Sequence, residues 1–192
     1  MRTRGATGLC LVVAFGIAVF GVASARETKH RPVMLGHGTL SRYEWSVVVA
    51  RDGGKRGGQR PCFVISRSDA RGSGGPREFS GYTKGCTAPP NSGSPFVLSD
   101  TAGEGSREMA IFVIAFTPKV ASAYLDFGSD GHMRVRLKRL NSVQQRNAGV
   151  RPLRYVAFAL KGDRCLREVK GYSAAGSEIF SGPIDECSEA GE

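Results

Sequence analysis

The sequence contains few residues of the types that enzymes most often use for nucleophilic or acid–base catalysis. It has three histidines, His30, His37 and His132. The first two fall in an N-terminal segment that we expect to be flexible, and the third borders a predicted turn, so none is held on a rigid scaffold. The segment Gly171-Tyr-Ser-Ala-Ala-Gly176 comes nearest to a serine nucleophile motif. Its second glycine is one residue too late for Gly-x-Ser-x-Gly, and a hairpin turn explains it better.

Paired carboxylates are the remaining route to hydrolysis. Two acids that face each other across a cleft would suit a glycosidase. The acids near predicted strand ends are Asp126, Asp130, Glu168 and Glu178. The glycine-rich segment 51–60 lacks the Lys-Ser/Thr of a phosphate-binding loop and the strand-to-helix setting of a dinucleotide site. We assign no catalytic residue and no cofactor. The sequence favours a non-enzymatic protein, with an extracellular hydrolase that uses an unrecognised carboxylate site as the alternative.

The cysteines are expected to form disulfides. Cys10 lies in an N-terminal segment that should be removed, which leaves Cys62, Cys86, Cys165 and Cys187. An even number in an exported chain favours two disulfides. Of the three possible pairings we favour Cys62–Cys86 with Cys165–Cys187, because each pair is close in sequence and brackets a glycine-rich turn. Each bond would be worth about 3 kcal/mol. No Cys-x-x-Cys pair occurs, so no metal site is assigned.

Positive charge is the strongest signal for binding. The chain carries 27 Lys and Arg against 17 Asp and Glu, a formal net charge of +10. The cations gather in the glycine-rich segment and at alternate positions of a later strand. The candidate anion-binding residues are Arg51, Lys55, Arg56, Arg60, Arg134, Arg136 and Lys138. They would bind anionic cell-envelope polymers or lipid headgroups, unless they form only an ordinary solvated surface. The aromatic residues lie in apolar strands rather than among the basic loops, which argues against nucleic acid.

Short apolar segments must position these residues. They are rich in Val, Ile, Phe and Tyr and are bounded by Gly, Pro, Ser and Asp, and we find no amphipathic helical stretch with clear caps. The expected strands are 43–50, 61–66, 78–82, 109–116, 120–127, 132–140, 154–161, 166–172 and 177–181. Hairpin turns are expected at 128–131, 162–164 and 174–176. Segment 109–116 is apolar almost throughout, which predicts a central strand buried on both faces.

This spacing of strands predicts an all-β fold, an antiparallel β-sandwich of immunoglobulin-like architecture with long loops. The loop-rich stretch 67–107 is interpreted as excursions within one domain, because neither half has enough apolar strands to bury a core alone. The expected organisation is a helical signal peptide over 1–25, a flexible segment over 26–40, a single domain over 41–187 and a tail over 188–192.

The N-terminus has the three parts of a secretory signal. Arg2 and Arg4 precede an uncharged stretch over 5–25 that ends in Ala23-Ser-Ala25. Cleavage between Ala25 and Arg26 would release a secreted or cell-envelope-associated protein whose net charge is still +8. The alternative is an uncleaved segment that tethers the domain to the membrane, since 5–25 is nearly long enough to span it. No later segment is a candidate span.

Several stretches carry a resemblance. They are Trp45-Ser-Val-Val-Val-Ala50 followed by Cys62-Phe-Val-Ile65, and Ile111-Phe-Val-Ile-Ala-Phe-Thr-Pro118 continuing through Gly128-Ser-Asp-Gly131 and Tyr155-Val-Ala-Phe-Ala-Leu160 to Val169-Lys-Gly-Tyr-Ser-Ala-Ala-Gly176. Together they resemble small exported β-sandwich proteins of high-GC Gram-positive bacteria that have no assigned activity. The resemblance implies a sandwich fold and export, and it supplies no catalytic residue. The sequence leaves the oligomeric state open and favours a secreted or envelope-associated binding or structural domain.

We expect N-terminal sequencing of the exported protein to begin at Arg26, because signal peptidases accept small residues such as Ala23 and Ala25 before the cut. Protein that starts at Met1 and partitions with membranes would contradict cleavage and support the tether.

Overall fold

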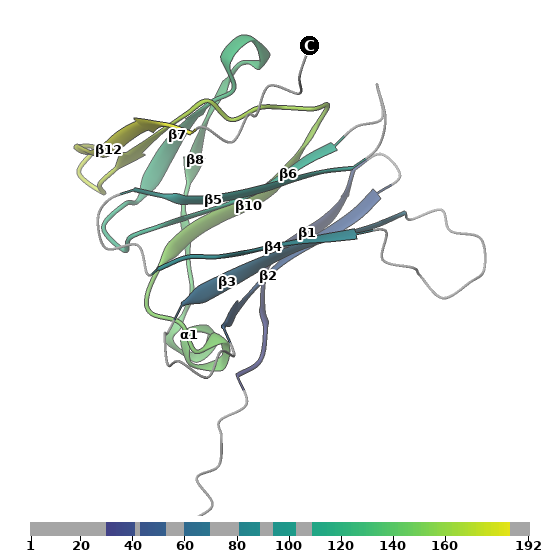
Figure 1. Cartoon of the computed structure of the whole chain (residues 1–192). Helices are drawn as coiled ribbons and strands as arrows, with labels where there is room; N and C mark the ends of the chain where they lie inside the picture. Colours follow the sequence, from purple (N-terminus) through teal and green to yellow (C-terminus); the bar gives the residue numbers. More distant parts are fainter. Residues whose placement is uncertain are drawn as a thin grey trace, which may run out of the picture.

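The structure, a computed structural model, describes residues 30–40, 43–52, 60–69, 81–88, 94–102 and 109–184. In these ranges the chain is mostly β-strand, with one α-helix and one short 3-10 helix (Figure 1). The strands are β1 (Val33–Leu40), β2 (Tyr43–Arg51), β3 (Pro61–Asp69), β4 (Gly81–Cys86), β5 (Phe96–Ala102), β6 (Met109–Phe116), β7 (Ser122–Asp126), β8 (His132–Arg136), β9 (Lys138–Arg139), β10 (Arg154–Lys161), β11 (Glu168–Tyr172) and β12 (Glu178–Pro183). The helix is α1 (Ser142–Ala148), and the 3-10 helix is Gly128–Asp130.

The strands form three four-stranded sheets, and all their pairings are antiparallel. Sheet A has the order β1-β2-β3-β4, sheet B has β5-β6-β10-β9, and sheet C has β12-β11-β7-β8. Figure 1 shows them as three tiers, with sheet B between the other two. The predicted all-β antiparallel fold is confirmed. The immunoglobulin-like architecture is not confirmed, because that sandwich has two sheets and this chain builds three.

Strand β6 explains the third sheet. Every residue from Met109 to Phe116 is buried, as the sequence predicted. Successive side chains of a strand point to opposite faces. The odd-numbered residues from Met109 to Ala115 join the core between sheets A and B, and the even-numbered ones from Ala110 to Phe116 join the core between sheets B and C. A strand that is apolar on both faces must have another layer packed against each face. A single facing sheet would cover only one of the two faces.

Two glycines let sheet A approach sheet B at opposite edges. A Cβ added to Gly36 of β1 would lie 3.1 Å from the Cβ of Ala157 on β10. A Cβ added to Gly85 of β4 would lie 2.9 Å from the ring of Phe96 on β5. Both distances are shorter than an ordinary contact between carbon atoms. Sheet A therefore lies face to face on sheet B, with β1 over β10 and β4 over β5.

Three elements lie where the sequence predicted none. Strand β1 occupies most of the segment expected to be flexible, and β5 lies within the loop-rich stretch. Helix α1 has a capping box, in which Asn141 Oδ1 accepts from the amide of Gln144 and Gln144 Oε1 accepts from the amide of Asn141, both at 2.9 Å. The helix ends at Gly149, whose φ of 67° is left-handed. The spacing of the box is a sequence signal for this helix, but a helix of only seven residues is too short to show a clear amphipathic pattern.

Two predicted connections also differ. The segment 132–140 is not one strand, since β8 belongs to sheet C and β9 to sheet B, with buried Leu137 between them. The turn at 162–164 does not close a hairpin, because β10 lies in sheet B and β11 in sheet C. The hairpin turns at 128–131 and 174–176 are confirmed, with positive φ at Gly128, Gly131 and Gly176.

Some predictions fall outside the described residues. They are the signal segment 1–25 with its helix and its cleavage point at Ala25 and Arg26, and the tail 188–192. In the part of the chain that the structure describes, no helix combines the length and the apolar character needed to span a bilayer.

We expect Phe112→Ala to lower the free energy of unfolding by about 3–5 kcal/mol. Phe112 is buried between sheets B and C, where its ring centroid lies 5.4 Å from that of Phe158 and 5.7 Å from that of Phe127. Denaturant unfolding measures the loss. Val143→Ala on the exposed face of α1 is the control, with an expected change within about 0.5 kcal/mol. Equal losses in the two variants would contradict a core between sheets B and C.

Candidate functional site

The candidate anion-binding residues do not form one cluster. Arg51 ends β2 and Arg60 directly precedes β3, so both lie at one end of sheet A. Lys55 and Arg56 lie outside the described residues. The remaining cations lie on β8 and β9, which belong to sheets C and B. The predicted set therefore separates into two groups, of which the second is fully described.

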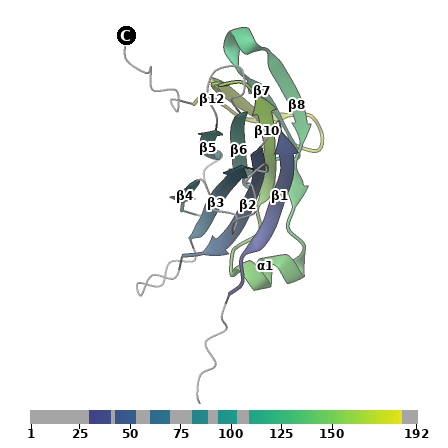
Figure 2. The ribbon, with the colours of Figure 1, turned by 90° about the vertical axis from the view of Figure 1, so that its right-hand side faces the viewer.

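The second group extends into a cationic strip that consists of Arg134, Arg136, Lys138 and Arg139. All four residues are exposed. Figure 2 shows the chain running from β8 past β10 towards α1, and the strip follows this course. Strand β8 is an edge of sheet C and β9 is an edge of sheet B. Within the described ranges none of the four cations forms an ion pair with a carboxylate. The strip is therefore free to contact an anionic ligand.

Alternation along β8 explains why the arginines face outward. The residues between them, Met133 and Val135, pack against the core between sheets B and C. Because the side-chain period of a strand is two residues, this burial directs Arg134 and Arg136 to the outer face of sheet C. The alternating pattern in the sequence was enough to identify these two arginines. Arg139 was not predicted, because it stands where the alternation that runs from Met133 to Lys138 would place an apolar residue.

Aromatic side chains share the outer face of sheet C with these cations. The guanidinium carbon of Arg134 lies 5.6 Å from the ring centroid of Tyr172. Tyr124 stands opposite Arg134 across β7 and β8, and its ring stacks on His132 at 5.2 Å. Aromatic and cationic residues thus lie side by side on this face. The expectation that aromatic residues do not interleave with the basic loops concerns other segments and stays a prediction, as does the argument against nucleic acid.

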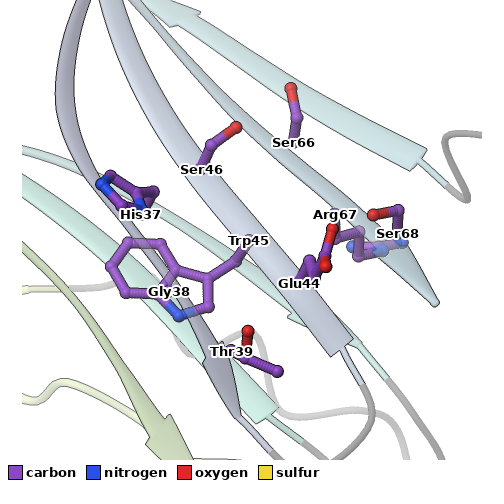
Figure 3. A pocket seen from close by; sticks show the side chains of 9 residues that line it. All are labelled: His37, Gly38, Thr39, Glu44, Trp45, Ser46, Ser66, Arg67 and Ser68. Carbon is purple, nitrogen blue, oxygen red and sulfur yellow. The ribbon is translucent and has the colours of Figure 1, made fainter. Parts of the chain in front are cut away.

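A hydroxyl-lined hollow of about 340 Å³ lies on sheet A (Figure 3). It is lined by His37, Gly38, Thr39, Glu44, Trp45, Ser46, Ser66, Arg67 and Ser68. Strand pairing places His37, Ser46 and Ser66 in one row across β1, β2 and β3. In Figure 3, Ser46 and Ser66 point to the same side of the sheet.

The hollow has the residue types of a serine hydrolase without the required contacts. A serine nucleophile needs a hydrogen bond to its base. The ring of His37 makes no hydrogen bond to any described residue, although Ser46 is its direct neighbour on β2. The serine and threonine hydroxyls and the carboxylate of Glu44 instead form a set of mixed donors and acceptors. Such a set suits a ligand rich in hydroxyl groups.

A second hollow, the edge hollow, has a volume of about 580 Å³ and lies between sheets A and B. It is lined by Met34, Leu35, Gly36, His37, Trp45, Lys138, Ala157, Phe158 and Ala159. His37 and Trp45 line both hollows, so the two adjoin. Lys138 connects the edge hollow with the cationic strip.

Trp45 is a residue of this site that was not predicted from the sequence. Its indole lies over two glycines of β1, where a Cβ on Gly38 would be 3.1 Å from Nε1 and a Cβ on Gly36 would be 3.3 Å from Cζ3. The ring therefore needs residues without side chains on the neighbouring strand. The alternation Gly36-His-Gly38 opposite a lone tryptophan was the available signal. This signal can be interpreted only when strand β1 is known, and that segment was expected from the sequence to be flexible.

The four candidate carboxylates do not form a catalytic pair in a cleft. Asp126 and Glu168 are direct cross-strand partners on the outer face of sheet C, but neither lines a hollow described above. Asp126 Oδ1 accepts from the amide of Gly128 at 2.9 Å. Glu168 Oε2 lies 3.3 Å from Nζ of Lys170, and this hydrogen bond raises the pKa of Lys170. Asp130 lies in the exposed 3-10 helix, and Glu178 is exposed on β12, so these two acids do not complete a site.

The Cys62–Cys86 disulfide is present, as the sequence predicted. It joins direct cross-strand partners of β3 and β4. Asp52 lies beside it, and its carboxylate and the two sulfur atoms are within 4.8 Å of one another. Because both sulfurs are in the disulfide, they are not the thiolates that a metal ion requires. Cys165 is also disulfide-bonded. Its expected partner Cys187 lies outside the described residues, so that pairing stays a prediction.

An ion pair beside the hydroxyl-lined hollow joins two sheets. Arg67 of β3 donates through Nη1 to Oδ1 of Asp100 on β5. The two side chains are 25% and 10% exposed, respectively. The guanidinium lies over Gly81 of β4, where a Cβ would be 3.1 Å from Nη2. The other oxygen of Asp100, Oδ2, is buried without a hydrogen-bond partner. This ion pair fixes Arg67 at the border of the hollow.

Comparison of the chain with protein-family models, with curated proteins and with solved structures gave no match. The candidate site thus consists of the cationic strip, the edge hollow and the hydroxyl-lined hollow, which follow one another from sheet C to sheet A.

We expect Arg67→Met to lower the free energy of unfolding by about 2–3 kcal/mol, less than for a fully buried pair because Arg67 reaches solvent. The substitution leaves Asp100 buried without its cation. The double variant Arg67→Met/Asp100→Leu should lose less free energy of unfolding than Arg67→Met, since it leaves no unpaired charge buried. Denaturant unfolding of both variants tests this order. A double variant less stable than Arg67→Met would show that the pair itself contributes net stability.

Proposed function

We propose that this protein is an exported, non-enzymatic binding domain that recognises an anionic polymer of the cell envelope, and specifically an acidic polysaccharide. Export rests on the N-terminal signal pattern and on the resemblance to small exported β-sandwich proteins. The observation that carries the binding proposal is the exposed cationic strip, whose four cations have no carboxylate partner among the described residues.

The geometry of the strip suits a polymer rather than a single small anion. Alternate residues of a strand are about 7 Å apart, so Arg134 and Arg136 form a pair of charges along β8, and Lys138 and Arg139 continue the strip on β9. A ligand with repeated carboxylates contacts several of them at once and gains affinity from each added contact. The guanidinium groups also bind carboxylates in a bidentate way.

The two hollows favour a polysaccharide among anionic polymers. Lys138 connects the strip to the edge hollow, and His37 and Trp45 connect this hollow to the hydroxyl-lined one. The sugar units of an acidic polysaccharide carry hydroxyl groups that pair with the serines and with Glu44. Lipid headgroups share the negative charge but lack this long hydroxyl-rich chain.

Cations on edge strands also have a purely protective role. Charged residues on β8 and β9 prevent edge-to-edge association with other chains. This role requires no ligand and predicts no difference between anionic and neutral polymers. Binding measurements therefore separate it from recognition.

We expect the mature domain to bind immobilised polygalacturonate at low salt, to be released at high salt, and to ignore neutral dextran. The triple variant Arg134→Ser/Arg136→Ser/Lys138→Ser should bind at least about tenfold more weakly, since each cation near an anionic surface contributes about 1 kcal/mol. The matched control is Arg31→Ser/Lys119→Ser/Arg151→Ser, which loses the same charge at exposed positions outside the strip.

Three outcomes would contradict the proposal. Equal, negligible retention at both salt concentrations would exclude electrostatic binding. Equal losses in the two triple variants would show that net charge alone acts. Tighter binding to anionic phospholipid vesicles than to polygalacturonate would favour lipid headgroups as the ligand. Unchanged unfolding midpoints would show that both variants keep the fold.

A further inference from the structure

Strand β10 is paired along only part of one edge. Its whole length, Arg154–Lys161, pairs with β6. On the other side β9 pairs with it only at Arg154 and Tyr155. From Val156 to Leu160, no strand among the described residues pairs with this second edge. In an antiparallel sheet, every second residue directs its N–H and C=O away from a given neighbour. This part of β10 therefore presents backbone donors and acceptors at the edge of sheet B.

The edge hollow lies where β9 stops. It is lined by Ala157, Phe158 and Ala159 of β10, by Lys138 of β9, and by residues 34–37 of β1. Strands β4, β5, β8 and β12 are also edges of their sheets, but none of them lines a hollow described above, whereas β1 lines the opposite side of the edge hollow. The unpaired part of β10 thus differs from those four edges in having a space of about 580 Å³ beside it.

We propose that this edge binds an extended acidic peptide, which adds to sheet B as a further strand beside β10 and in line with β9. Strand addition of this kind takes affinity from backbone hydrogen bonds and specificity from alternate side chains. The proposal shares Lys138 and the edge hollow with the proposed polysaccharide site, but it rests on backbone groups of β10 that polysaccharide recognition does not use.

Charge and side-chain size define the peptide. Lys138 stands opposite Tyr155, and Lys161 ends β10, so both lysines share a face of sheet B with Ala157 and Ala159. That face packs against sheet A. No acidic residue lines the edge hollow. The lysines at the two ends favour acidic residues at the ends of the peptide, and the small alanines leave room for apolar residues between them.

The probe is the peptide Glu-Thr-Val-Thr-Val-Thr-Glu with blocked ends. Its alternate positions carry the acidic and apolar residues, and its composition favours the extended conformation. Two control peptides carry N-methyl groups, one on the three threonines and the other on the two valines and the second glutamate. Both keep the charge of the probe. In a strand, one set of amides faces the partner strand and the other set faces solvent.

We expect the unmethylated peptide to bind the full-length mature protein in fluorescence anisotropy. One methylated peptide should bind at least about tenfold more weakly, because its methyl groups replace the donors that face β10. The other should bind about as well as the unmethylated peptide. Equal binding of all three would show that charge alone acts and would overturn the proposal. Absence of binding by the unmethylated peptide would also overturn it.

Hydrogen exchange locates the bound peptide. Amide exchange should slow between Val156 and Leu160 and stay unchanged in β4, β5, β8 and β12, the edge strands that line neither hollow. Lys138→Glu should weaken binding, whereas Lys119→Glu, an equal charge change in an exposed turn, should not. Protection on β1 or on another edge strand in place of β10 would put the peptide elsewhere and refute the proposal. If the peptide does not bind while polygalacturonate binding is normal, strand addition is refuted and the proposed polysaccharide recognition is not.

Discussion

Burial of β6 on both faces is the constraint on which the rest of the fold depends. All eight residues of Met109–Phe116 are buried. Burying one large apolar side chain is worth about 1.5–3 kcal/mol, so exposure of either face of this strand would cost a large part of a domain's stability. Sheet A covers one face and sheet C covers the other. Strands β5 and β10 flank β6 and send alternate side chains to both cores in the same way.

The layered arrangement also determines where binding groups are available. Each sheet is open and has two edge strands, and the middle sheet has its faces covered and only its edges exposed. The chain crosses from sheet C to sheet B between β8 and β9, and this crossing places the cationic strip where two sheets end. Because β9 is two residues long, it leaves most of β10 without a second neighbour. The edge hollow and the strip thus arise from the same crossing.

Close contacts between layers depend on residues with little or no side chain. Gly36 and Gly38 of β1 accept the indole of Trp45, and Gly36 also lies against Ala157. The Arg67–Asp100 ion pair links sheets A and B beside the hydroxyl-lined hollow. The Cys62–Cys86 disulfide holds β4, an edge strand, to β3. These contacts keep sheet A, which carries the hydroxyl-lined hollow, in a fixed position against the central layer.

The sequence by itself determined the local properties. Continuous apolarity predicted that Met109–Phe116 is buried on both faces, alternation predicted outward arginines on β8, and proximity predicted the Cys62–Cys86 bond. Such features depend on neighbours along one strand or within one hairpin. Tertiary structure alone decided the number of sheets and the existence of β1 and β5. It also decided that Trp45, His37 and Lys138 line the same hollow. These depend on pairing between strands distant in sequence, and glycine-containing strands such as β1 are stabilised by packing rather than by their own propensity.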